Sequence, residues 1–231
     1  MRYFLILFLF IELSITFNTV HAATPDWEEN EQVAKILTEA GTKGTFVLFD
    51  VTLNKFTGYN FERANTRYIP ASTFKIPNSL IGLETGAVKN VDEIIVYDGK
   101  PVEMLSTWKT ASSLRDAIKV SNLPIYQTLA RRIGLARMRE QIAKINYGNN
   151  ETGDIVDSFW IRGPLKISAI EQIQFLAKLA RQELHFAKEH QLVVREIIKN
   201  EQGYGWTIYA KTGYATICDS DIGWWVGWVV R

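Results

Sequence analysis

The chain has 231 residues, of which 47% are hydrophobic and 22% are charged, and its formal net charge at neutral pH is +1. This composition is typical of a globular protein, and the balanced charge gives no reason to expect a nucleic-acid partner or an anionic membrane surface. The single cysteine, Cys218, excludes an internal disulfide, and the histidines lack the spacing of metal ligands (His21, His185 and His190). No metal or cofactor-binding site is therefore expected.

The first 22 residues form a segment of their own. Arg2 opens it, an apolar run follows, and Val20-His21-Ala22 closes it with a small-x-small pattern. This layout predicts a secretory signal peptide over residues 1–22. The alternative is a membrane anchor, but Glu12 interrupts the apolar run and leaves it short for a bilayer span. We therefore expect one domain over residues 23–231, exported to a bacterial periplasm and free of the membrane after cleavage.

The start of this domain combines a hairpin with a helix. Residues 45–60, TFVLFDVTLNKFTGYN, contain two β-rich runs around a turn at residues 52–55. Residues 72–86 are expected to form a helix that ends at Gly86, because glycine is favoured just after the last helical residue. Pro77 is expected to distort the beginning of this helix.

Residues 91–199 are predicted to be mainly helical. Ser112 or Ser113 can cap one helix, while Pro124 and Gly134 mark the start and the end of the next. A capping-box pattern opens a later helix at Ser168 and Glu171. The apolar positions of that helix share one face (Ile173, Leu176, Ala180 and Leu184).

Two β-rich runs follow, at residues 205–215 and 222–230. A hairpin, a helical middle and late strands together predict an α+β domain whose sheet is built from both ends of the chain.

The first motif with catalytic potential pairs Ser72 with Lys75 in the spacing S-x-x-K. Positions i and i+3 share one face of a helix, so the hydroxyl and the amine can meet. A serine needs an adjacent base to act as a nucleophile, and burial beside Phe74 and Ile76 would lower the lysine pKa from about 10.4. A neutral amine can act as that base or react with carbon dioxide to give a carbamate. Taken alone, the motif is better interpreted as a solvated surface pair.

Three short strings accompany this pair. Ser121-Asn122-Leu123 follows a helix end and offers a second hydroxyl for proton transfer. Tyr147-Gly148-Asn149 lies in a turn-rich loop. Lys211-Thr212-Gly213 lies in a predicted strand, where the lysine supplies positive charge and the glycine leaves room for a substrate along the strand edge. Each string is common alone, but their order and spacing in one chain are not.

The set resembles the penicillin-recognising serine enzymes, which carry S-x-x-K and K-T-G. More narrowly, the sequence resembles the class D, oxacillinase-type β-lactamases through YIPASTFKIPNSLIGLETG, YGN, SFWIRGPLKIS, AKTGY and WWVGW. The resemblance covers nearly all of residues 24–228. It implies the serine β-lactamase/transpeptidase-like fold, an antiparallel sheet flanked by helices with a helical lobe.

The resemblance also implies catalytic roles. Ser72 is expected to attack the lactam carbonyl and form an acyl-enzyme, with Lys75, N-carboxylated by carbon dioxide, as the general base. Ser121 is expected to relay a proton toward the lactam nitrogen. Trp160 is expected to stabilise the carbamate through its indole N–H, although a buried tryptophan is as readily a core residue.

Substrate binding is expected on the K-T-G strand. Lys211 and Thr212 would contact the substrate carboxylate, beside Gly213 and Tyr214. The backbone N–H groups of Ser72 and Tyr214 would form the oxyanion hole. The implied partner is a β-lactam, the only added group is carbon dioxide or bicarbonate, and a monomer or homodimer is expected.

Two departures from the family pattern stand out. Leu123 replaces the usual valine and adds a methylene beside the base. Family members continue past WWVGW with a strand that lies between that strand and the hairpin, then a carboxylate-binding arginine and a helix, whereas this sequence ends at Arg231. The expected sheet therefore lacks its bridging strand and has unpaired edges. Alternatives to hydrolysis are a β-lactam sensor or transpeptidase-like protein that acylates without turnover, and an inactive truncated product.

Overall fold

The computed structural model describes residues 26–97, 108–217 and 220–231. The predicted signal peptide and Cys218 lie outside these residues. In chain order the elements are β1 (Trp27–Glu29), α1 (Glu31–Glu39), β2 (Phe46–Asp50), β3 (Lys55–Tyr59), α2 (Phe61–Asn65), the 3-10 turn η1 (Ala71–Phe74), α3 (Lys75–Glu84), α4 (Leu114–Lys119), α5 (Leu123–Ile133), α6 (Leu135–Ile145), α7 (Phe159–Arg162), α8 (Ala169–Arg181), α9 (Lys188–Ile197), β4 (Lys199–Gly203), β5 (Trp206–Ile217) and β6 (Ser220–Val230).

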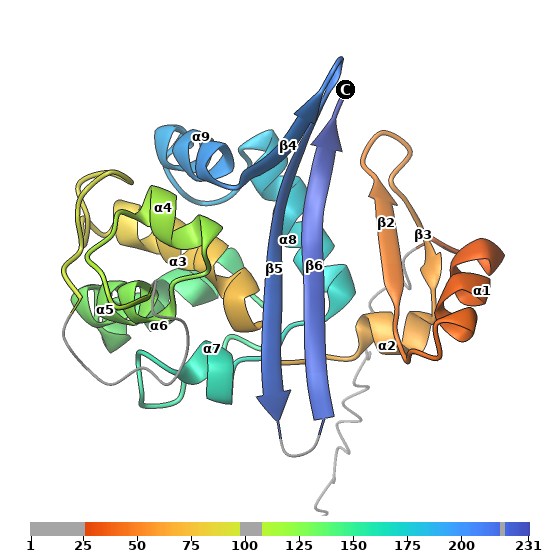
Figure 1. Ribbon diagram of the computed structural model, residues 1–231, viewed down its shortest axis with the longest axis horizontal. Helices are drawn as coiled ribbons and strands as arrows, with labels where there is room; N and C mark the ends of the chain where they lie inside the picture. The colour runs from red at the N-terminus through yellow and green to blue at the C-terminus, as the bar shows by residue number, and fades with distance from the viewer. Residues whose placement is uncertain (1–25, 98–107, 218–219) are drawn as a thin grey trace, which may run out of the picture.

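The predicted hairpin is confirmed as β2 and β3. The Asp50 carboxylate accepts the backbone N–H groups of Thr52 and Leu53, and Asn54 adopts a positive φ of 53° that closes the turn. The short strand β1 joins β3 in parallel, which gives a three-stranded sheet of order β1-β3-β2. The helix α1 packs beside this sheet (Figure 1).

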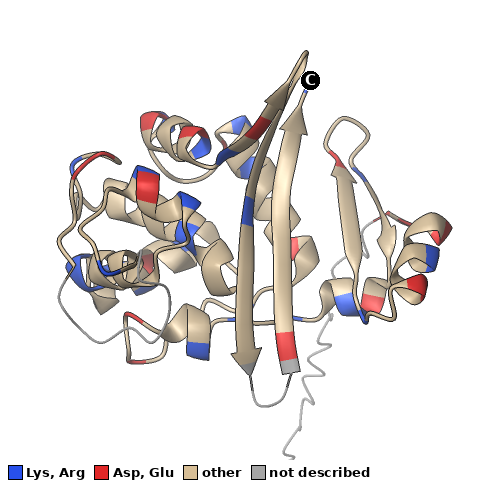
Figure 2. Cartoon of the chain, viewed as in Figure 1, with Lys and Arg blue, Asp and Glu red and all other residues tan. Residues whose placement is uncertain are grey.

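The predicted late strands are confirmed as β5 and β6, which pair antiparallel along their whole lengths. β4, which the sequence pattern did not indicate, adds to β5 and gives a second sheet of order β4-β5-β6. β5 carries a single charged residue, Lys211, while basic and acidic residues are interspersed over the helices (Figure 2).

The two sheets do not pair with each other, so the expectation of one sheet from both chain ends is wrong for the described residues. β2 and β6 each have one edge without a described partner strand, as the resemblance to the family predicted. α8 packs against both β2 and β6. A single helix therefore holds the two sheets in one α+β arrangement (Figure 1).

The helix predicted over residues 72–86 forms in two parts. A 3-10 turn, η1, carries Ser72 and leads directly into α3, which begins at Lys75. Pro77 therefore falls within the first turn of α3, where its missing N–H has no intrahelical partner to lose. All nine residues from Lys75 to Leu83 are buried, with α5 and α9 packed against them.

The helical middle begins later than predicted. The described residues between 91 and 113 contain turns and an isolated bridge between Ile95 and Ser112, and the helices begin with α4 at Leu114. Ser113, not Ser112, caps α4. Pro124 near the start of α5 and Gly134 at its end are confirmed, as is the capping box of α8. None of the helices in the described parts of the chain combines the length and hydrophobicity that crossing a bilayer requires.

The capping box of α8 gives a stability prediction. The Ser168 hydroxyl accepts the N–H of Glu171 at 3.2 Å, and the Glu171 carboxylate accepts the N–H of Ser168 at 2.9 Å. Ser168→Ala should lower the free energy of unfolding by about 1 kcal/mol, measured by urea denaturation. Ser158→Ala is the matched control, because Ser158 occupies the cap position of α7 without a side-chain cap bond. An equal loss in both variants would contradict the assignment.

Candidate active site

The predicted nucleophile and base meet at the junction of η1 and α3. Lys75 donates from Nζ to Ser72 Oγ over 2.8 Å. Ser72 is half-buried, whereas Lys75 is only 1% exposed. The solvated-pair interpretation of the motif is therefore wrong.

The surroundings of Lys75 favour a neutral amine. No carboxylate of the described residues forms an ion pair with its Nζ. Burial lowers the pKa of Lys75 well below its usual value, and the positive charge of Lys211 lowers it further. A lysine in this state can accept the proton that Ser72 must lose to act as a nucleophile.

Two residues that the sequence analysis missed, Ser79 and Tyr126, form hydrogen bonds next to Lys75. Ser79 donates from Oγ to the Lys75 carbonyl at 2.8 Å, and the same Oγ lies 2.8 Å from the Tyr126 hydroxyl. Burial also raises the pKa of Tyr126, so its phenol stays protonated and hydrogen-bonded. In the sequence, the signal that could have identified them was a polar side chain on an otherwise apolar helix face.

β5 packs directly against the turn that carries Ser72. A Cβ on Gly213 would lie 3.0 Å from the carbonyl oxygen of Pro70 and 3.1 Å from Cγ2 of Thr73. The missing side chain therefore lets the strand approach the serine turn closely, a packing role that the sequence did not reveal.

Lys211 places a second amine near Lys75. It is 7% exposed, and its Nζ donates to the Thr212 carbonyl at 2.9 Å. Burial lowers the pKa of Lys211 to about 8, which still leaves it mainly protonated at neutral pH. Thr212 and Tyr214 point to the exposed face of the strand, where 61% of Tyr214 is accessible to a ligand.

Ser121 lies at the junction of α4 and α5, with a positive φ of 55°. It is half-buried and does not hydrogen-bond to Ser72 or Lys75 in this structure. The next residue, Asn122, caps α5 by accepting the N–H of Ile125 at 3.2 Å. Across from this junction, a cavity of about 350 Å³ separates the end of α4 from β5 (its lining includes Ile118, Lys119, Lys211, Thr212 and Trp225).

Trp160 and Tyr147 pack behind the serine turn. Both are buried and both contact Phe74: the Trp160 ring stacks on it at 5.4 Å and the Tyr147 ring meets it edge-on at 5.7 Å. The aromatic cluster therefore holds Phe74, the residue just before Lys75, in position.

The YGN loop and α8 supply a polar support that includes another residue missed from the sequence, Gln172. Its Nε2 donates to Thr73 Oγ1 at 2.6 Å, and its Oε1 accepts from the Tyr147 hydroxyl at 3.2 Å. Asn149 donates to the Pro164 carbonyl and accepts the Lys166 N–H, so it shapes the loop. In the sequence, a glutamine on the buried face of the α8 helix was the feature that could have predicted this hydrogen-bond network.

Within the described ranges, no three His, Cys, Asp or Glu side chains gather closely enough to hold a metal ion.

The sequence and the fold of this chain are both similar to those of known proteins. Residues 25–231 match the penicillin binding protein transpeptidase domain. The chain is 42% identical to β-lactamase OXA-48 of Klebsiella pneumoniae, covering 90% of this chain and 78% of that protein, and 41% identical to OXA-5 of Pseudomonas aeruginosa, covering 95% and 83%. The crystal structure of FUS-1 (OXA-85), a class D β-lactamase from Fusobacterium nucleatum subsp. polymorphum, superposes with a TM-score of 0.84 at 48% identity, covering 87% of this chain and 84% of that one.

The buried amine gives a prediction on stability and pH. Between the lowered pKa of Lys75 in the folded chain and its ordinary value of 10.5, the unfolded chain binds a proton that the folded chain does not. The stability of the wild type should therefore rise as the pH increases through this window toward 10.5. Lys75→Met should therefore be more stable than the wild type by about 1–2 kcal/mol at pH 7, and the difference should shrink by pH 10. Urea unfolding at both pH values, in buffer free of carbon dioxide, measures it.

The control for this prediction is Lys178→Met, which replaces an exposed lysine of α8. Its stability difference from the wild type should be small at both pH values. A Lys75→Met protein that is less stable than the wild type at pH 7 would contradict a neutral buried amine.

Proposed function

The chain belongs to the class D β-lactamases, and we propose that it hydrolyses β-lactam antibiotics through a serine acyl-enzyme and so confers resistance to them. The observation that carries the proposal is the 2.8 Å hydrogen bond from the buried amine of Lys75 to the hydroxyl of the half-buried Ser72. It supplies a nucleophile and a base in contact, in surroundings that keep the base uncharged.

Acylation follows from this pair. Ser72 Oγ forms a bond to the lactam carbonyl carbon and gives its proton to Lys75. The tetrahedral centre then collapses, the ring C–N bond breaks, and the departing nitrogen takes a proton through Ser121. The backbone N–H groups of Ser72 and Tyr214 stabilise the negative oxygen of the tetrahedral centre. Deacylation requires a water, activated by the base, to attack the same carbonyl carbon and release Ser72.

Lys75 is suited to carry carbon dioxide as a carbamate. Only a neutral amine reacts with carbon dioxide, and the burial of Lys75 supports that state. The carbamate would supply a carboxylate-like base for both half-reactions. The nearby charge of Lys211 favours an anion at this position, and Trp160, which packs beside Phe74, is proposed to donate its indole N–H to it.

The substrate carboxylate is proposed to bind at Lys211 and Thr212. Lys211 is the single charge of β5 and lines the cavity between that strand and α4. Gly213 and Tyr214 continue the same strand beside the serine turn, so the carboxylate and the lactam carbonyl would bind to neighbouring residues. The substrate is a β-lactam, and Leu123 is proposed to adjust access to the base.

Hydrolysis is tested with a purified protein and a penicillin, with and without added bicarbonate. Ser72→Ala and Lys75→Ala should each lower kcat/KM by about 10³-fold or more, because each removes one member of a unit. Lys178→Ala, the surface control, should keep full activity. Turnover that survives Ser72→Ala in a protein shown by circular dichroism to be folded would overturn the proposal.

Mass spectrometry distinguishes hydrolysis from stable acylation. A hydrolase should show a transient adduct of the penicillin mass on the wild type and none on Ser72→Ala. An adduct that persists without product would identify a β-lactam sensor or transpeptidase-like protein instead. Neither adduct nor product, with an unfolded spectrum, would identify an inactive chain.

We also propose that residues 1–22 direct export and are removed, which leaves the protein in the periplasm. The support is the sequence layout of Arg2, the apolar run and the Val20-His21-Ala22 site. The intact mass of protein recovered from a periplasmic extract should correspond to a chain that begins at Ala23. A mass that includes residues 1–22 would contradict this.

A further inference from the structure

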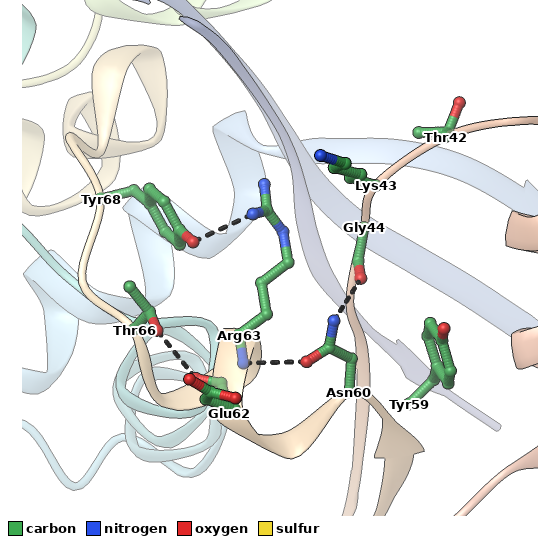
Figure 3. Close-up of a pocket in the computed structure, with 9 residues that line it drawn as sticks. All are labelled: Thr42, Lys43, Gly44, Tyr59, Asn60, Glu62, Arg63, Thr66 and Tyr68. Atoms are coloured by element: carbon green, nitrogen blue, oxygen red, sulfur yellow. Dashed lines mark hydrogen bonds between the residues drawn. The ribbon is translucent and has the colours of Figure 1, made fainter.

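A second pocket, of about 340 Å³, lies at the base of the N-terminal sheet and shares no lining residue with the cavity beside β5 (Figure 3). It is formed by the loop before β2, the end of β3, and the segment that runs from α2 to Tyr68. Its lining is mainly polar (Thr42, Lys43, Gly44, Tyr59, Asn60, Glu62, Arg63, Thr66 and Tyr68).

Arg63 is held in a fixed position at this pocket. Its Nη1 donates to the Tyr68 hydroxyl at 3.0 Å, and its guanidinium lies 4.8 Å from the centroid of the same ring. Its backbone N–H is bound by the Asn60 side chain at 3.1 Å. A guanidinium has five N–H donors, and among the described residues only Tyr68 accepts from this one. The side chain is therefore oriented but most of its donors are left for another acceptor.

Arg63 differs from most arginines of the described chain in having no carboxylate partner there. Six others form ion pairs with acidic side chains (Arg67, Arg115, Arg131, Arg132, Arg139 and Arg181). The guanidinium charge of Arg63 is thus uncompensated although the side chain is half-buried.

Lys43 brings a second positive charge to the same space. Figure 3 shows its side chain directed from the loop before β2 toward the side of the pocket where the Arg63 guanidinium lies. Within the described residues, Lys43 has no ion pair. Glu62 is the single acidic residue of the lining, and no ion pair within the described chain joins it to either cation.

We propose that this pocket, the Arg63 pocket, binds a small oxyanion: a phosphate or a compact dicarboxylate. The planar fork of an arginine matches two oxygens of such a group, and Lys43 can contact a third. The negative charge removes the repulsion between the two cations. The volume exceeds that of one phosphate, so both kinds of anion fit.

A bound oxyanion would connect two parts of the chain. Lys43 precedes β2, while Tyr68 pairs with Ile167 through two backbone hydrogen bonds and lies four residues before Ser72. The anion would hold the N-terminal sheet to the segment that leads into the serine turn. Because it binds only the folded state, it raises the stability of the protein.

The test measures binding of inorganic phosphate and of succinate to the full chain by calorimetry, together with the melting temperature, at constant ionic strength set by chloride. Lys43→Met and Arg63→Gln should each weaken binding by about tenfold or more, because each removes a charged donor. Glu62→Gln should strengthen it, since it removes the competing negative charge. Lys178→Met is the surface control and should bind as the wild type does. Binding of phosphate alone or of succinate alone would support the pocket and identify its ligand class.

Phosphate also stabilises proteins in general by exclusion from their surfaces. A rise in melting temperature that is equal in all variants, or saturable binding that Lys43→Met leaves unchanged, would overturn the proposal. If Arg63→Gln fails to fold, the opposite responses of Lys43→Met and Glu62→Gln still decide the question, because both residues are exposed.

Discussion

The burial of one amine, that of Lys75, is the constraint on which the rest of this structure depends. An amine can stay buried without a carboxylate partner only by giving up its charge, and both its burial and the nearby charge of Lys211 favour that outcome. α3 is buried from its first residue, the Tyr126 ring covers the amine, and Phe74 is held between Trp160 and Tyr147. The Ser72 hydroxyl then accepts the hydrogen bond that the Lys75 amine donates.

Lys211, the second buried lysine, lowers the stability of the folded protein but also supplies a positive charge for an anionic substrate. Lys211 lies close enough to lower the pKa of Lys75, and burial lowers its own pKa to about 8. Burying two amines next to each other costs folding free energy. The apolar core around the site must offset this cost for the protein to fold. The same arrangement provides an uncharged base and, beside it, a positive charge for an anionic substrate.

The position of the site relies on helices more than on one continuous sheet. β5 reaches the serine turn because Gly213 permits close contact with Pro70 and Thr73. The two three-stranded sheets have no described strand in common, and α8 packs against both. That helix also carries Gln172, which bonds Thr73 and Tyr147. One helix thus joins the sheets and supports the turn that carries the nucleophile.

The amino-acid sequence alone determined the features that depend on neighbours a few residues away. Four features were predictable: the spacing of Ser72 and Lys75, the β2–β3 turn, the cap at Ser168 and the limits of α5. A turn or cap is closed by bonds within four residues, so the local sequence specifies it. The tertiary structure decided what depends on distant segments: the short strands β1 and β4, the packing role of Gly213 and the contacts of Gln172. These follow from partners tens of residues away, and no local pattern of side chains specifies which segment will lie against which.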